Sequence, residues 1–217
     1  MAGLGERFSD VLVTLAGGST ILLLVLTMIA SLILGLPLPP VTCYLILAVL
    51  AAPALIKAGV HPMAAHLFVF YFGTLGNISP PVAPTSFAAA GIAGTDPVRT
   101  TNLTFLFSLP SFLVPYLFVY SNEVMLMGNL GRILLRVFTS FIAISCIAIA
   151  FQGQLLRSLG WILRFGFLIA GLLLIYPYWV TDIAGYLLLA ILIFVHAMAV
   201  RGKGLHTARQ RQDGSSR

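Results

Sequence analysis

Neutral oxygen and amide side chains gather in one short stretch of an otherwise apolar chain. This stretch, residues 73–94, reads GTLGNISPPVAPTSFAAAGIAG. Because proline lacks a backbone N–H and clashes with the preceding turn, Pro80 and Pro81 should end a helix at or before Ser79. The freed carbonyls, with nearby hydroxyls and an amide, suit a hard cation such as Na⁺. The predicted Na⁺ ligands are Gly76, Asn77 and Ser79, and Thr74, Pro80 and Pro81 complete this ion- and substrate-binding segment. A Pro-kinked packing helix with small residues is the alternative interpretation.

The helix that restarts after the prolines would direct its positive end at the same place, which favours a carboxylate. No catalytic constellation accompanies it. His61 and His66 are five residues apart and match no zinc motif, so we expect neither a metalloenzyme nor a cofactor beyond a coupling ion. Asp96, Glu123 and Asp182 lie at expected turns or interfaces, which leaves no buried carboxylate for a proton relay.

The composition is that of an integral membrane protein. Hydrophobic residues make up 59% of the chain and charged residues 8%, and the mean hydropathy is +1.04. A soluble domain carries roughly 25% charged residues. The net charge of +6 is concentrated in the polar tail 201–217, which is typical of the cytoplasmic flank of a last membrane helix. The partner that this pattern predicts is the lipid bilayer, and nucleic acid is not expected.

The elements around the polar stretch should be membrane helices. Residues 11–58 predict a re-entrant helical hairpin whose tip lies at 35–40, although two full spans joined by a tight turn fit the same residues. The expected tip residues that face the polar stretch are Gly35, Pro37 and Thr42. Next come a broken helix at 62–93, a span at 100–120 kinked by two prolines, and C-terminal membrane helices within 129–200, at 133–151, 161–180 and 183–200. The fold class is therefore all-α and membrane-integral.

The positive charges suggest an orientation. A cytoplasmic C-terminus places Asp182 outside and Arg99 inside. The broken helix then runs from the outer to the inner face, and the hairpin enters from and returns to the outer face.

An ordered set of motifs over about sixty residues resembles a known family. The motifs are the turn Gly35–Pro39, Ala52–Ala54, AAHLFVFYFG at 64–73, ISPPV at 78–82 and AAAGIAGTDP at 88–97. Together they resemble the large membrane subunit of tripartite ATP-independent periplasmic (TRAP) transporters. The resemblance is closest to the subtype in which the small and large membrane subunits are fused and which works with a TAXI-type binding protein.

This resemblance implies a Na⁺-driven secondary importer of organic acids, such as C4-dicarboxylates, in the bacterial inner membrane. It also implies a periplasmic solute-binding protein and two inverted repeats, each with a hairpin and a broken helix. Only one of each is apparent, so residues 1–128 are expected to be the second repeat, with the first repeat and the small membrane subunit as partners. Pro39-Pro40-Val41-Thr42 also replaces the usual Pro-Thr-Thr of the tip. The alternative functions are a non-transporting membrane scaffold or an inactive fragment of such a permease.

Overall fold

The computed structural model describes residues 2–155 and 158–214, and over these ranges the protein is helical, with one isolated bridge between Gln154 and Ser158 in place of strands. It forms two compact units, Met1–Ile133 and Leu134–Arg217, which we call unit 1 and unit 2. Unit 1 contains α1 (Ala2–Ala16), α2 (Thr20–Gly35), α3 (Pro40–Leu50), α4 (Ala52–Lys57), α5 (Pro62–Leu75), η1 (Gly76–Ile78), α6 (Pro84–Ala93), α7 (Pro97–Ser108), η2 (Leu109–Leu113), α8 (Val114–Tyr120) and η3 (Asn122–Met125). The expected all-α membrane class is confirmed.

The predicted start of the hairpin at residue 11 is wrong. A turn at Gly17 and Gly18, with φ of 54° and 82°, separates α1 from α2. Both angles lie in the left-handed region that glycine adopts without steric cost. Ser19 then caps α2, since its hydroxyl accepts a hydrogen bond from the Leu22 N–H at 3.4 Å. The first arm of the hairpin is therefore α2 alone, and α1 is a separate helix.

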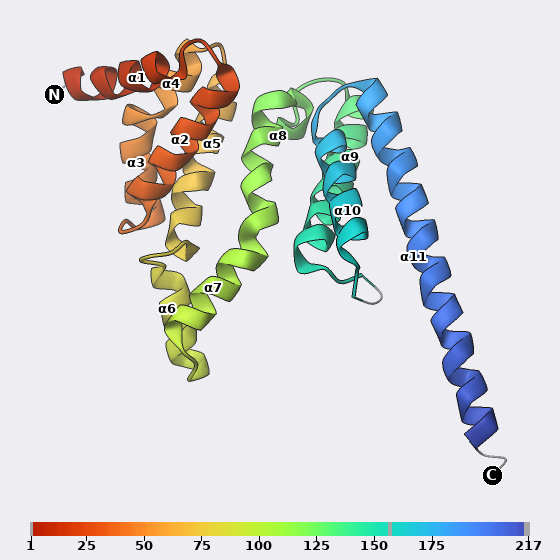
Figure 1. Cartoon of the computed structure of the whole chain (residues 1–217). Helices are drawn as coiled ribbons and strands as arrows, with labels where there is room; N and C mark the ends of the chain where they lie inside the picture. The colour runs from red at the N-terminus through yellow and green to blue at the C-terminus, as the bar shows by residue number, and fades with distance from the viewer. Residues whose placement is uncertain (1, 156–157, 215–217) are drawn as a thin grey trace. The chain divides into compact units, whose positions relative to one another are not determined.

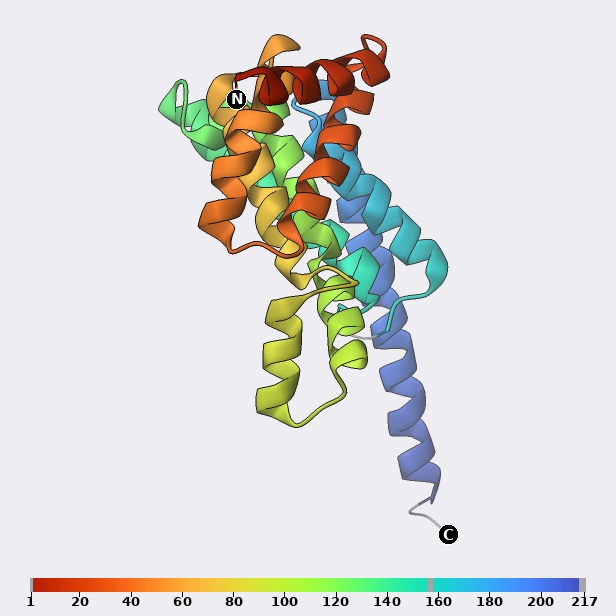
Figure 2. The same ribbon diagram turned by 90° about the vertical axis from the view of Figure 1, so that its left-hand side faces the viewer.

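The second arm of the hairpin is α3 followed by α4, and together they cover Pro40–Lys57, which is long and apolar enough to cross a membrane. The core of unit 1 lies between this hairpin, α5 and α8. Phe68 and Phe72 of α5 are fully buried, with ring centroids 4.8 Å apart, and both rings also pack edge-on against Tyr116 of α8. Figures 1 and 2 both show α1 lying across one end of this bundle and the α6–α7 pair extending from the other.

The connection from α6 to α7 ends in a capped helix start. Asp96 accepts a hydrogen bond from the Arg99 N–H at 2.7 Å, and Pro97 occupies the first helical position. The expected kinked span is also present: Pro97–Tyr120 is a candidate membrane span in which η2, containing Pro110, interrupts the α-helix.

Unit 2 is formed by α9 (Leu130–Gln152), α10 (Trp161–Ile175) and α11 (Trp179–Gly214), with the first residues of α9 belonging to unit 1. The predicted helix 161–180 ends too late, because the chain is already extended at Tyr176 and Pro177 follows. In the helices α9 and α11, the segments Leu130–Gln152 and Trp179–Met198 are candidate spans. The basic tail continues α11 as a helix to Gly214, and residues 215–217 lie outside the described ranges.

Candidate functional site

The helix break lies where the proline pair predicts it. The α-helix α5 ends at Leu75, η1 adds a single turn of 3-10 helix, and Ser79 is extended, with φ of −95° and ψ of 137°. The Pro80–Pro81 peptide bond is cis. Ala83 then adopts a left-handed conformation, φ 39° and ψ 55°, before α6 begins. The α5 and α6 helices, of 14 and 10 residues, are about 21 and 15 Å long, so each is shorter than a bilayer core of about 30 Å.

Three predicted site residues bond through their side chains to carbonyl groups of their own segment. The Thr74 hydroxyl donates to the Tyr71 carbonyl at 2.8 Å, and the Ser79 hydroxyl donates to the Leu75 carbonyl at 2.8 Å. The Asn77 amide N–H donates to the Thr74 carbonyl at 3.5 Å, the outer limit of a hydrogen bond. Because each group acts as a donor, its side-chain oxygen keeps lone pairs that a cation can use. Ser79 is only 6% exposed, which places one such oxygen inside the protein.

The hairpin tip and the break touch through their backbones. A Cβ atom added to Gly35 would overlap the carbonyl oxygen of Gly73 and lie 2.9 Å from the Gly73 Cα. A Cβ atom on Gly76 would lie 2.8 Å from the Gly35 carbonyl carbon and 2.9 Å from the Leu32 carbonyl oxygen. Real Cβ atoms essentially never approach so closely, so only glycine allows this contact. The structure thus brings together Gly35 and Gly76, which the sequence placed on opposite walls of the site.

Gly73 extends the contact to α3. A Cβ atom there would lie 2.7 Å from the Cys43 sulfur and 2.8 Å from the Leu47 Cδ1. The other two predicted tip residues take no part in this packing, since the side chains of Pro37 and Thr42 are exposed. Gly73 was not among the predicted site residues, although small residues in apolar helices are enriched where helices pack closely.

The start of α6 presents free donors beside the break. Ala83 provides no side-chain cap, and Pro84 has no N–H, so the amides of Thr85 and Ser86 in the first turn have no helical partner. The Ser86 hydroxyl is buried, at 2% exposure for the residue, and has no hydrogen-bond partner in the part of the chain that the structure describes. The sequence identified the positive helix end and includes Ser86 among the polar residues of the stretch, but it did not predict that this hydroxyl is buried.

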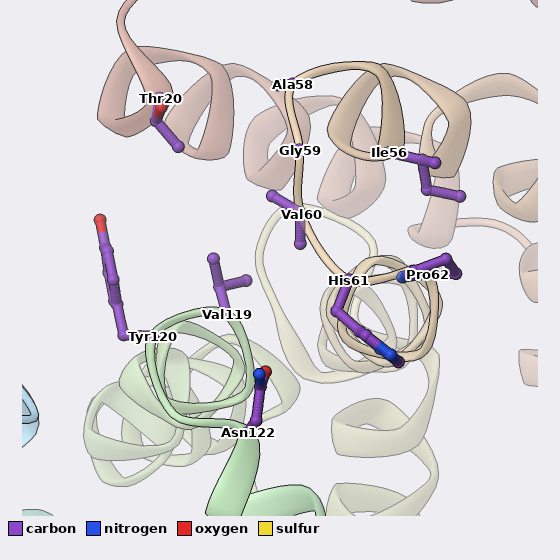
Figure 3. A pocket seen from close by; sticks show the side chains of 10 residues that line it. All are labelled: Thr20, Ile56, Ala58, Gly59, Val60, His61, Pro62, Val119, Tyr120 and Asn122. Carbon is purple, nitrogen blue, oxygen red and sulfur yellow. The ribbon is translucent and has the colours of Figure 1, made fainter.

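A separate pocket of about 640 Å³ opens at the other end of α2 and α5. Figure 3 shows it between Thr20, the loop from Ala58 to Pro62, and Val119, Tyr120 and Asn122. The His61 Nδ1 accepts the Met63 N–H at 3.3 Å, so this ring nitrogen caps α5. Since Thr20 and Gly35 are separated by the 16-residue length of α2, about 24 Å, the pocket is distinct from the break.

The remaining candidate side chains form pairs rather than clusters. The Nδ1 atom of His66 in α5 lies 3.3 Å from the Tyr44 hydroxyl of α3, so the two side chains form an interhelical hydrogen bond. Cys43 and Cys146 are free and buried. Within the described residues, no three His, Cys, Asp or Glu side chains approach closely enough to hold a metal ion.

A helix interrupted by glycine and proline, with a helical hairpin packed on the interruption, is an arrangement found in secondary membrane transporters. Residues 1–133 match the family described as the tripartite ATP-independent periplasmic transporter, DctM component. The match covers more than half of the chain, so the protein belongs to this family and is a multi-pass membrane component of a TRAP transporter. Such transporters work with a periplasmic binding protein and further subunits. Comparisons with curated proteins and with solved structures give no match.

The family match and the structure agree on one boundary. The match ends at residue 133, and unit 1 ends at Ile133. The hairpin tip, the break and α6 therefore all belong to the part of the chain that carries the family resemblance, and unit 2 lies beyond it.

Proposed function

We propose that this chain is a permease component of a Na⁺-coupled importer of organic acids, and that Na⁺ binds at the helix break. The observation that carries the proposal is the backbone contact of Gly35 with Gly73 and Gly76. It places the hairpin tip directly on a segment where α-helical hydrogen bonding stops and backbone carbonyls become available. The side-chain oxygens of Thr74, Asn77 and Ser79 supply further neutral ligands, the kind that Na⁺ accepts.

The substrate in this proposal is a carboxylate. The two unpaired amides in the first turn of α6 and the positive end of the helix dipole favour an anion next to the cation. A site that uses neutral oxygens for Na⁺ and backbone amides for a carboxylate needs no ionised side chain of its own. This agrees with the positions of the eight Asp, Glu, Lys and Arg residues of unit 1, all of which lie outside residues 58–95.

The proposal extends to the partners and the location. A TAXI-type binding protein would deliver the substrate from the periplasm, and the small membrane subunit and a first inverted repeat would complete the permease in the inner membrane. The asymmetric exposure of the break supports a missing wall, because Pro80, Pro81 and Val82 are exposed although they adjoin the buried Ser79. The basic C-terminal tail supports a cytoplasmic C-terminus.

Na⁺ binding to the purified chain tests the ion site, first alone and then with a protein that contains the first repeat. Asn77→Ala should weaken Na⁺ binding several-fold, whereas Asn102→Ala, at an exposed asparagine of α7, should leave it unchanged. Thermal unfolding in the absence of Na⁺ distinguishes an ion-binding residue from a structural one. Replacing a residue that only binds the ion should leave the unfolding midpoint near the wild-type value. Equal Na⁺ binding by both variants and the wild type would refute the site.

One observation favours the scaffold alternative. The hydroxyls of Thr74 and Ser79 already bond within their own segment, as they would in a kinked helix that only packs against its neighbours. A chain that binds no Na⁺ in either preparation, but still associates with the other subunits, would support a scaffold role.

A further inference from the structure

The helix α1 has three faces of different chemistry. One face is buried against the base of the hairpin: Ser9 donates to the Leu50 carbonyl at 2.8 Å, and a Cβ atom on Gly5 would lie 2.8 Å from the Val49 carbonyl oxygen. Leu12 and Ala16 continue this buried stripe at 6% and 4% exposure. The helix is therefore held firmly on α3 by its backbone and small side chains.

The second face is apolar but uncovered. Leu4, Phe8, Val11 and Leu15 follow one another at spacings of four, three and four residues, which places them on one side of a helix. Leu4 is 71% exposed, Val11 55% and Leu15 61%. An apolar stripe of this length is not expected to face water in a helix that also has a polar side, which Glu6, Asp10 and Thr14 provide here.

The position of α1 in unit 1 matches the edge of a bilayer. Figures 1 and 2 show it lying across the ends of the hairpin helices rather than along them. The ion pair between Lys57 Nζ and Asp10 Oδ1, at 2.7 Å with both side chains about half exposed, lies at the same end. Charged side chains and an in-plane amphipathic helix at one level are typical of the lipid–water interface.

A groove of about 280 Å³ runs along the uncovered face, lined by Leu4, Arg7, Phe8 and Val11 of α1 and by Leu50 of α3. Arg7 lies between the apolar and polar sides of α1 and forms no ion pair among the described residues. Asp10 lies about one helical turn beyond Arg7 on the polar side, but it is already bonded to Lys57. Glu6 is adjacent in sequence, and neighbouring helical side chains do not face each other. The groove thus combines an apolar floor with one free cation at its rim.

We propose that this groove binds one acidic phospholipid of the bilayer, with an acyl chain along Leu4, Val11 and Leu50 and the phosphate paired with Arg7. The aliphatic part of an arginine can lie along apolar surface while its guanidinium reaches the headgroup level. A guanidinium also matches the geometry of phosphate oxygens. The bound lipid would fix α1 at the interface and, through Ser9 and Lys57, hold the base of the hairpin in place.

Native mass spectrometry of the full chain, released from phosphatidylglycerol nanodiscs into mild detergent, tests the proposal. The wild type should retain one phospholipid. Arg7→Gln should retain about five-fold less, the factor that corresponds to about 1 kcal/mol for one basic residue at an anionic surface. Val11→Trp should fill the groove and abolish retention, while Arg99→Gln, at an exposed arginine of α7, should retain the lipid as the wild type does. Since Arg7 and Val11 are exposed, neither change disturbs the core.

Nitroxide labels at Leu15→Cys and Glu6→Cys in the same nanodiscs give an independent measurement. Dissolved oxygen should enhance the spin relaxation of the first label, and a water-soluble nickel chelate should enhance that of the second. Three outcomes would overturn the proposal: equal lipid retention by all variants, no retained lipid in the wild type, or nickel-enhanced relaxation of both labels. If the wild type is a dimer and Val11→Trp dissociates it, a second chain, and not lipid, covers the groove.

Discussion

Replacing Gly35 by alanine tests whether the hairpin tip is packed on the helix break through its backbone. The added methyl group would overlap the carbonyl oxygen of Gly73 and lie 2.9 Å from its Cα and carbonyl carbon. Nonbonded carbon atoms prefer about 3.5–4.0 Å. Because every obstructing atom belongs to the backbone, no side-chain rotation can relieve the overlap, and α2 must move away from α5 by about 1 Å.

The expected cost follows from this displacement. Inserting a methyl group into a closely packed contact typically costs about 1–3 kcal/mol. For a chain of this size, 1 kcal/mol lowers the thermal midpoint by about 2–4 °C, which gives a decrease of about 2–12 °C. Alanine in place of glycine also raises helix propensity by up to about 1 kcal/mol, which offsets part of the loss. The variant should also bind Na⁺ more weakly, since its tip carbonyls would be displaced from the break.

Thermal unfolding of the detergent-solubilised chain, followed by far-ultraviolet circular dichroism, measures the effect. Gly91→Ala is the matched control, because a Cβ atom on that α6 residue meets nothing within 4 Å. It should leave the midpoint unchanged or raise it. Gly73→Ala should be destabilising to a smaller degree, since its methyl group meets the ends of Cys43 and Leu47, which can rotate, and a second change, Cys43→Ala, should restore part of the loss. A Gly35→Ala midpoint equal to that of Gly91→Ala would refute the backbone contact.

Two further predictions concern backbone strain and a partly buried ion pair. Ala83→Gly should raise the thermal midpoint by the equivalent of up to about 1 kcal/mol. The left-handed conformation costs a non-glycine residue about 1–2 kcal/mol, and the greater entropy of the unfolded glycine variant offsets part of this gain. A lower midpoint would contradict the prediction. In unit 2, Arg136 Nη1 lies 2.9 Å from Asp182 Oδ2, with side-chain exposures of 17% and 15%. Asp182→Asn should destabilise the chain by about 1.5–3 kcal/mol, because it leaves a partly buried guanidinium without its charged partner. Arg136→Met together with Asp182→Leu should recover most of this loss. Equal midpoints for the wild type, Asp182→Asn and the double variant would refute a stabilising ion pair.

The sequence predicted the features that local chemistry determines. Proline at positions 80 and 81 can end a helix in any surroundings, and Asp96 before Pro97 is a capping pattern that needs no tertiary partner. The boundary between α1 and α2 was missed for a related reason. Gly17 and Gly18 lie within a long apolar run, and hydrophobicity alone does not distinguish a glycine inside a membrane helix from one that turns the chain.

The site required information that no single segment contains. Gly35 and Gly73 are 38 residues apart. Only the packing of α2 on α5 brings the Gly73 backbone so close to position 35 that a residue with a Cβ atom does not fit there. Thr42 was predicted from its type and position near the tip, but α3 directs its side chain outward. The left-handed conformation of Ala83 has no sequence signal at all, since alanine usually avoids it and the surrounding structure imposes it.

Ser79 shows how the structural and ion-binding roles of the break can be separated. Its hydroxyl stabilises the break by donating to the buried end of α5 at Leu75, so Ser79→Ala should cost about 1–3 kcal/mol whether or not an ion binds. Loss of stability alone is therefore no test of a ligand. Ser79→Thr keeps both the donor and the oxygen, and if Ser79 coordinates Na⁺, this variant should keep the wild-type Na⁺ affinity while Ser79→Ala loses it. Wild-type Na⁺ affinity in a folded but less stable Ser79→Ala variant would leave Ser79 a purely structural role, and the ion would then depend on the backbone carbonyls of the break and on Asn77.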